Sequence, residues 1–340
     1  MNFIIVIILI LTFPFNSFWF FQKKVDVFAL GNEKKEEVER PKGEIEGSEK
    51  IKEEKNLLPS PPPVPQFLPQ RKEEAEDLVI PNAHSSLILD AGSGTILHYN
   101  NGKERRQIAS LAKLMTAVLV MENVGDLEEE VTVDEEAVYI EGTKTGCPRS
   151  GYCIGERLKV GEKLTVLSLL KSMLLYSAND AAVALGKHIS GTQEEFAKLM
   201  NKKAKELDLG DSNFCTPSGL EITGRESECY SSAYDIALIA AYSMKYNIIW
   251  EILRLPNATI SSTDGKCTHE IINTDLVLDQ VPNCLGGKTG FTPLAGRSLL
   301  LAANDETETH KIVAVLLDDP YRWQDIKTMI DWTFKAYDWR

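Results

Sequence analysis

A serine and a lysine separated by two residues, Ser110 and Lys113, could together perform nucleophilic catalysis. In a helix this spacing puts both side chains on one face about one turn apart, so the amine can reach the hydroxyl. The residues between and after them are mainly small or apolar, and desolvation by such neighbours lowers the pKa of an amine towards that of a useful base. A serine at a helix N-terminus also presents its backbone N–H to a developing oxyanion.

Two further groups could complete such a site. Ser177 and Asn179 lie at a polar break between two helical segments, where a hydroxyl and an amide can point outward together. Alternatively, they cap the helix that begins near residue 180. The run from Lys288 to Gly290 lies in a strand-like segment, where Gly permits close approach of a ligand and Lys and Thr can hold an anion.

Both short motifs occur a second time, so neither is specific alone. The spacing of Ser110 and Lys113 recurs at Ser168 and Lys171, which we interpret as a solvated patch on another helix. Lys-Thr-Gly recurs at residues 144–146, in a polar, loop-like segment that precedes the Ser-x-Asn motif. We therefore assign the working Lys-Thr-Gly to residues 288–290.

Elements that must position these residues begin near residue 78. Alternation of apolar residues and turn signals predict strands at 86–90, 95–99, 285–292, 297–304 and 310–318. Helical periodicity predicts helices at 110–124, 166–176, 181–189 and 323–339. We expect an α/β fold of the α+β type, with an antiparallel sheet of about five strands flanked by helices plus a helical subdomain.

The N-terminal quarter has a different organisation. Residues 3–21 carry no charge and nearly match the thickness of a bilayer core, so we assign residues 1–31 to a membrane segment, kept as a signal anchor or cleaved as a signal peptide. Residues 32–77 are charged and then proline-rich, which predicts a disordered stalk ahead of a catalytic domain at 78–340. Lys23 and Lys24 follow the apolar segment, and the positive-inside rule alone would place the domain in the cytoplasm.

Charge excludes some classes of function. The chain has 340 residues, a formal net charge of −13 and a pI near 5.0. Binders of nucleic acid need clustered excess Lys and Arg, so we expect no nucleic-acid partner. The sequence has five His, no Cys-x-x-Cys pair and no His-Glu-x-x-His run, and we expect no metal and no cofactor.

In this order, the three motifs resemble those of the serine D-alanyl-D-alanine carboxypeptidases, the low-molecular-mass penicillin-binding proteins. The resemblance spans roughly residues 86–334 and rests on the segments IASLAKLMTA, LLYSANDAA, MNKKAKELDLG, FCTPSGL, SSAYDIALIA and GGKTGFTPLAGRSLL. It implies a fold like that of the β-lactamases and transpeptidases. It also implies peptidoglycan stem peptides as substrate, β-lactams as covalent inhibitors and a role in cell-wall biosynthesis.

The resemblance implies a catalytic role for several residues. Ser110 would attack the peptide carbonyl between two terminal D-alanines and form an acyl-enzyme, with Lys113 as the base. Ser177 and Asn179 would relay protons and hold the substrate amide. The backbone N–H groups of Ser110 and Phe291 would form the oxyanion hole.

Substrate-binding roles follow in the same way. Lys288 would supply positive potential and Thr289 would bind the terminal carboxylate, with Gly290 between this pair and the oxyanion hole. Arg322 stands where the family often places a second carboxylate clamp, although an ordinary surface arginine fits the sequence as well.

Six cysteines are unusual for this family. By proximity we predict three disulfides, each closing a loop-like stretch, with buried free thiols as the alternative: Cys147 with Cys153, Cys215 with Cys229, and Cys267 with Cys284. Disulfides need an oxidising compartment, so we expect an extracytoplasmic domain at the cytoplasmic membrane, or a secreted or periplasmic one if the segment is cleaved.

Three other functions stay open at this stage. Endopeptidase action on peptidoglycan cross-links would use the same residues. A class A β-lactamase shares two motifs, but its Glu-x-x-x-Asn pattern has no clear counterpart between Asn179 and Lys288. A silent sensor that binds β-lactams or cell wall has no need to retain the whole catalytic set.

Overall fold

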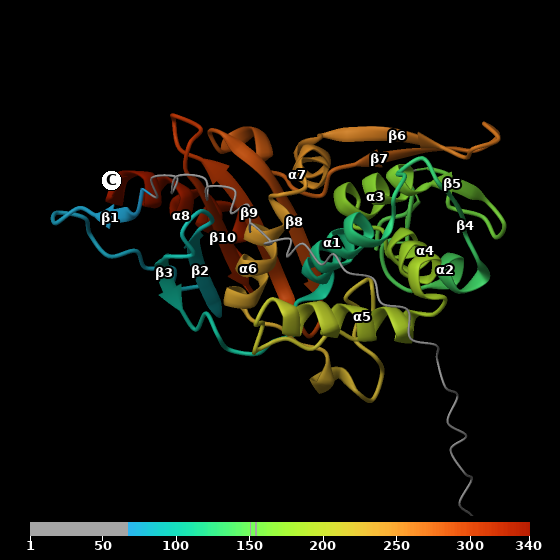
Figure 1. Ribbon diagram of the computed structural model, residues 1–340, viewed down its shortest axis with the longest axis horizontal. Coiled ribbons are helices and arrows are strands. Elements are labelled where there is room, and N and C mark those ends of the chain that lie inside the picture. The colour runs from blue at the N-terminus through green and yellow to red at the C-terminus, as the bar shows by residue number, and fades with distance from the viewer. Residues whose placement is uncertain (1–66, 150, 154) are drawn as a thin grey trace, which may run out of the picture. The chain divides into compact units, whose positions relative to one another are not determined.

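The computed structural model in Figure 1 describes residues 67–149, 151–153 and 155–340. The predicted membrane segment at 1–31 and most of the predicted stalk lie outside these residues. In the part that is described, no single helix is long and apolar enough to cross a membrane. Two helices, Ala233–Ser243 and Asn247–Arg254, reach that length and apolar content only when taken together, and the chain bends by 109° between them.

A five-stranded sheet forms the centre of the domain. Its order is β3-β2-β10-β9-β8, and every neighbouring pair is antiparallel. The strands are β2 (Ser85–Asp90), β3 (Ile96–Asn100), β8 (Cys284–Thr292), β9 (Gly296–Asn304) and β10 (Lys311–Leu317). These are the five strands expected from the sequence, and the strand with the Lys-Thr-Gly motif of residues 288–290 lies at one edge.

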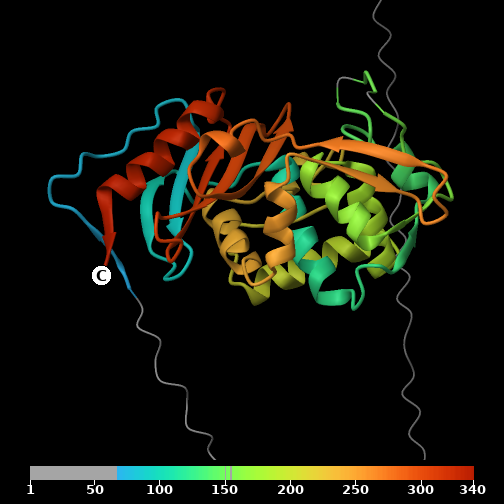
Figure 2. The ribbon, with the colours of Figure 1, turned by 90° about the horizontal axis from the view of Figure 1, so that it is seen from above.

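Both faces of the sheet are buried, which explains why its central strands are almost continuously apolar. Side chains such as Val313 and Val315 face the core beneath α6 (Ala233–Ser243), while Ile312 and Ala314 alternate with them and face α8 (Arg322–Ala336). Figures 1 and 2 show these two helices on opposite sides of the sheet.

A helical region packs beside the edge strand β8. It contains α1 (Lys113–Asn123), α2 (Glu135–Tyr139), α3 (Val166–Leu175), α4 (Asn179–Ser190), α5 (Gln193–Glu206) and α7 (Asn247–Arg254). It also contains two small antiparallel sheets, one of β4 (Glu130–Thr132) with β5 (Lys163–Thr165) and one of β6 (Asn257–Ser261) with β7 (Thr268–Ile272). Residues 113–120 of α1 are all buried, so this helix is central, as its dense apolar pattern predicted.

The end of the predicted stalk belongs to the folded domain. β1 (Pro69–Arg71) pairs antiparallel with β11 (Tyr337–Trp339), which follows α8 directly. The stalk prediction is therefore too long at its C-terminal end, and the last helix is shorter than predicted. The three residues of β1 have little apolar content and gave no strand signal, and their pairing partner is more than 260 residues away in sequence.

Two of the three predicted disulfides are present, Cys147–Cys153 and Cys215–Cys229. The third is wrong, because Cys267 and Cys284 are free thiols. Cys267 lies in the turn before β7, and five extended residues carry the chain away from it at about 3.3 Å per residue. Cys284 is buried under α8 at the start of β8. A disulfide needs Cα atoms within about 7 Å of each other.

Candidate active site

Ser110 and Lys113 meet at the start of the central helix. Ser110 lies in a short 3₁₀ turn, Ala109–Ala112, and Lys113 is the first residue of α1. The Nζ atom of Lys113 is 2.8 Å from Ser110 Oγ. Ala109 has a left-handed backbone with φ of 49°, a strained conformation of the kind that persists at functional sites. Ser110 is partly exposed, whereas the side chain of Lys113 is fully buried.

The surroundings of Lys113 favour its neutral form. Burial lowers the pKa of this amine well below its usual value, and the nearby charge of Lys288 lowers it further. Nζ also contacts Asn179 Oδ1 at 2.7 Å and the carbonyl oxygen of Ser218 at 2.6 Å, and both of these atoms can only accept. A neutral amine has two N–H bonds and one lone pair. The two acceptors take the N–H bonds, which leaves the lone pair for the hydroxyl of Ser110.

Asn179 is fixed by backbone groups on both sides. It begins α4, its N–H donates to the carbonyl of Thr143, and its Nδ2 donates to the carbonyl of Glu141 at 2.7 Å. These bonds orient the amide so that Oδ1 faces Lys113. The sequence left open whether this residue merely caps a helix, and the structure brings it into the cluster around Ser110.

Ser177 and Lys288 form a second serine–lysine pair. Lys288 Nζ donates to Ser177 Oγ at 2.8 Å and to the carbonyl of Thr289 at 3.1 Å. Burial lowers the pKa of Lys288 to about 7, against the opposing effect of Asp275. Ser177 has a left-handed backbone with φ of 61°, at the break between α3 and α4. The break therefore turns a hydroxyl towards β8.

The strand β8 brings the anion-binding candidates next to the nucleophile. A Cβ atom on Gly290 would lie 2.9 Å from the carbonyl oxygen of Ile108, so only Gly lets this strand approach the turn that carries Ser110. Thr289 Oγ1 is held by a hydrogen bond of 2.6 Å to Thr274 Oγ1. Phe291 follows on the same free edge and is 47% exposed.

Arg322 is less directly connected to these groups. It is the first residue of α8, half-buried, and its guanidinium lies over the ring of Trp323. Burial lowers its pKa, with a further lowering from Arg297, while Asp275 acts in the opposite direction. Asp275 acts to raise the pKa of both Arg322 and Lys288, which among the described residues is the one connection between Arg322 and the site, and its role as a carboxylate clamp stays a prediction.

The second copies of the motifs have structural roles. Thr145 is buried, and its N–H and Oγ1 both donate to Asp180, so the copy at 144–146 anchors a loop to the start of α4. Ser168 lies in the first turn of α3, where its N–H donates to the side chain of Thr165. Neither copy competes with Ser110 or Lys288 for the site.

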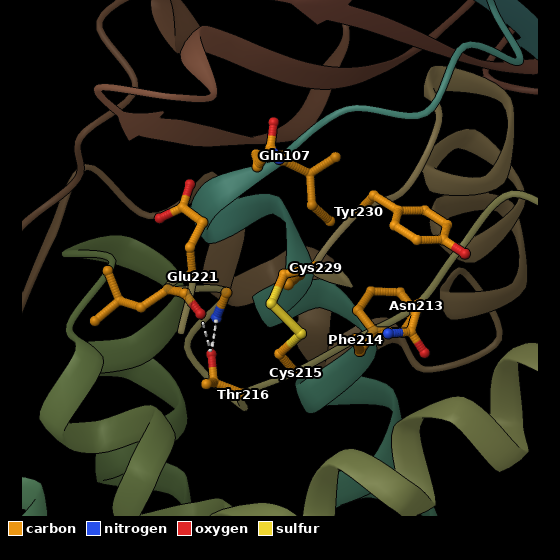
Figure 3. A pocket seen from close by; sticks show the side chains of 12 residues that line it. Gln107, Asn213, Phe214, Cys215, Thr216, Glu221, Cys229 and Tyr230 are labelled. Atoms are coloured by element: carbon orange, nitrogen blue, oxygen red, sulfur yellow. Dashed lines mark hydrogen bonds between the residues drawn. A yellow bond between two sulfur atoms is a disulfide. The ribbon is translucent and has the colours of Figure 1, made fainter. Parts of the chain in front are cut away.

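The loop at residues 216–220, to which the sequence assigned no role, packs against Ala109 and Lys113 on either side of the nucleophile. The carbonyl of Ser218 binds Lys113, and a Cβ atom on Gly219 would lie 2.0 Å from the carbonyl oxygen of Ala109. Figure 3 shows Thr216, which accepts from Gly219 N–H and donates to the carbonyl of Leu220, beside the Cys215–Cys229 disulfide and a cavity of about 20 Å³. A backbone carbonyl has no residue signature, so only the glycine could have marked this contact.

These groups can perform acyl transfer. The partly exposed hydroxyl of Ser110 faces the lone pair of the buried amine of Lys113. Lys288 and Thr289 lie opposite them on β8, the edge strand of the sheet. The arrangement supplies a nucleophile, a base and an anion-binding site within one cluster.

Comparison with known proteins agrees with this geometry. The family described as D-alanyl-D-alanine carboxypeptidase, peptidase family S11, matches residues 71–320. The chain belongs to this family. The D-alanyl-D-alanine carboxypeptidase DacF of Bacillus subtilis is 32% identical over 264 residues, which cover 75% of this chain and 63% of that protein.

Solved structures of this family and fold are similar to the domain. A D-alanyl-D-alanine carboxypeptidase from Mycobacterium tuberculosis has a TM-score of 0.68 and 27% identity, covering 78% of this chain and 96% of that chain. The Streptomyces K15 DD-transpeptidase has a TM-score of 0.66 and 24% identity, covering 75% and 98%, and is similar in fold. The predicted family and fold class are therefore confirmed. The match spans less than two thirds of the length of its family relative DacF.

Proposed function

We propose that this member of family S11 is a penicillin-binding serine carboxypeptidase that removes the terminal D-alanine from peptidoglycan stem peptides. The observation that carries the proposal is the set of three contacts at Lys113 Nζ. Two acceptors hold its N–H bonds and the third position faces Ser110 Oγ at 2.8 Å. This geometry prepares a neutral base for one particular hydroxyl.

Acylation then follows from these positions. Lys113 takes the proton of Ser110 as Oγ attacks the carbonyl carbon of the penultimate D-alanine. The carbonyl oxygen becomes an oxyanion, which backbone N–H groups of Ser110 and Phe291 would stabilise. Lys288 and Thr289 would bind the terminal carboxylate. When the tetrahedral intermediate collapses, the C–N bond breaks and the departing amine receives the proton.

Deacylation uses the same groups. Water attacks the ester carbon, Lys113 accepts a proton from the water, and the C–O bond to Ser110 breaks as the serine regains its proton. The products are the shortened stem peptide and free enzyme. A β-lactam would enter the first half of this cycle and remain bound as an ester at Ser110.

Labelled penicillin and defined muropeptides test the proposal. The full-length wild type should take up covalent label and release D-alanine from a pentapeptide, and Ser110→Ala should do neither. Label on Ser110→Ala would refute the nucleophile. Cleavage of cross-linked muropeptides instead of pentapeptide would establish an endopeptidase, rapid release of hydrolysed penicillin a β-lactamase, and label without any product a sensor.

We also propose that the domain works outside the cytoplasm, tethered to the cytoplasmic membrane by its N-terminal segment. The two disulfides of the domain support an oxidising compartment. The apolar composition of residues 3–21 supports the tether. Protease added to intact spheroplasts should digest the domain. Protection of the domain until the membrane is broken would contradict this placement.

A further inference from the structure

A disulfide-closed loop places one arginine on the open edge of β8. Cys147 and Cys153 close the loop, and Thr145, just before it, is anchored to the buried Asp180. Arg149 extends from this loop, and its Nη1 donates to the carbonyl oxygen of Phe291 at 2.8 Å. The guanidinium also lies 5.0 Å from the centre of the Phe291 ring. Contacts with both the backbone and the ring of Phe291 fix the arginine next to the expected oxyanion hole.

The bond to Arg149 shows which way Phe291 points. In an antiparallel pair, a residue directs its N–H and its C=O to the same side of the strand. The carbonyl of Phe291 accepts from a side chain outside the sheet, so it faces away from β9, at the free edge. Its N–H therefore faces the same free edge, as its expected place in the oxyanion hole requires.

This orientation places Arg149 relative to a substrate. A substrate residue whose carbonyl accepts from Phe291 N–H would, in an antiparallel pair, donate its own N–H to Phe291 C=O. That residue is the penultimate D-alanine, because its carbonyl is the one under attack. The carbonyl of Phe291 has two lone pairs and can keep Arg149 as well. The guanidinium then stands beside the residue that precedes the penultimate one.

Arg149 is free to bind an anion at that position. It is exposed, and no carboxylate lies within 4.0 Å of it among the described residues. A guanidinium has five N–H donors, and among the described contacts only the bond to Phe291 uses one. Residues 78–340 hold 26 basic and 36 acidic side chains, so the domain is acidic as a whole. A cation at this edge with no carboxylate partner among the described residues therefore makes the edge locally more positive than the rest of the domain.

We infer that Arg149 selects substrates with a side-chain carboxylate on the residue that precedes the penultimate D-alanine. The inference rests on the proposed function, since it concerns the substrate of the same site. A planar guanidinium can form two parallel hydrogen bonds with a carboxylate, which a neutral carboxamide of the same shape cannot match. Arg149 is a specificity-determining residue in this scheme and takes no part in the proton transfers.

Two matched peptides measure this selection in the full-length protein. N-acetyl-Glu-D-Ala-D-Ala and N-acetyl-Gln-D-Ala-D-Ala differ only in the charge of one side chain. Wild type should favour the acidic peptide in kcat/KM by about tenfold, as one charge-assisted contact predicts. Arg149→Gln should bring the ratio close to one, and Arg149→Lys should keep part of it. Arg157→Gln is the control, because it removes the same charge from an exposed site close by in sequence.

The ratio separates selection from a structural role. If Arg149 only held the loop, Arg149→Gln would slow both peptides equally, and an unchanged ratio would overturn the inference. A fall in the ratio for Arg157→Gln as large as for Arg149→Gln would also overturn it, since general charge would then explain the preference.

A pair of penicillins keeps this test separate from that of the proposed function. A penicillin with a carboxylate on its acyl side chain and benzylpenicillin acylate Ser110 without any need for peptidase turnover. If neither peptide is cleaved, the carboxypeptidase proposal fails, and the ratio of the two acylation rates still decides the role of Arg149. Absence of both acylation and cleavage would overturn both proposals.

Discussion

Replacing Gly219 with alanine should destabilise the domain more than the same replacement at Gly224, further along the same loop. Both glycines have left-handed backbones, with φ of 79° and 80°. A Cβ atom on Gly219 would lie 2.0 Å from the carbonyl oxygen of Ala109 and 2.8 Å from its carbonyl carbon, whereas nothing lies within 4 Å of a Cβ atom on Gly224. The two variants therefore share the backbone strain and differ in the clash.

The expected losses follow from these two contributions. Left-handed backbone costs an alanine about 1–2 kcal/mol, and this cost applies at both positions. Overpacking against groups that cannot move away adds about 1–3 kcal/mol, and it applies at Gly219 only. The free energy of unfolding should fall by about 2–5 kcal/mol in Gly219→Ala and by about 1–2 kcal/mol in Gly224→Ala.

Acylation should separate the variants as well. The clash at Gly219 pushes on the residue before Ser110, and the neighbouring carbonyl of Ser218 binds Lys113. We expect the rate of labelling by penicillin to fall in Gly219→Ala and to stay near that of the wild type in Gly224→Ala. Urea unfolding and the labelling rate are the two measurements. Equal losses of stability, with labelling unaffected in Gly219→Ala, would refute the view that this loop positions the nucleophile.

The remaining predictions concern charge and thiols. Lys288→Ala should slow acylation by about tenfold or more, because it removes a charge that binds the carboxylate, whereas Lys144→Ala should leave the rate nearly unchanged; equal effects would mean that the other Lys-Thr-Gly works. Since the pKa of Lys288 is lowered to about 7, its positive charge is lost as the pH rises through that value, and kcat/KM for a carboxylate substrate should fall on the alkaline side. On the acid side, kcat/KM should fall as Lys113 becomes protonated and can no longer accept a proton; a profile without these two limbs would argue against the assigned roles. Alkylation of the denatured, unreduced protein should label Cys267 and Cys284 alone, and six labelled thiols would exclude both disulfides.

The strands and the motif residues could be predicted because their signals are local. The inner strands β2, β9 and β10 are short, mainly apolar runs between turns, and burial on both faces of the sheet keeps those runs apolar. Ser110 and Lys113 are close in sequence, so helical spacing alone brings them together. Their partners Asn179 and Lys288 could be assigned only through the order of the motifs and the family resemblance.

Other features depend on contacts between distant parts of the chain. The carbonyl of Ser218 binds Lys113 from more than a hundred residues away, and any residue type could supply that carbonyl. In the sequence, nothing distinguishes Arg149 from other charged residues of a polar loop, and only the fold brings it into contact with Phe291. Proximity in sequence predicted two disulfides correctly, but it failed for Cys267 and Cys284 because an extended strand lies between them.

The pairing of β1 with β11 has a mechanical meaning. Leu68 and Arg340 exchange backbone hydrogen bonds of 2.9 and 3.1 Å, and Trp339 Nε1 donates to Asp90 on β2, so the pair lies on the β2 side of the sheet, away from the β8 edge (Figure 1). Tension applied to the chain ahead of residue 67 would first load the few hydrogen bonds of this pair. The candidate site beside β8 would receive that load only through the whole width of the sheet, so the domain could be pulled from one side without distorting the site on the other.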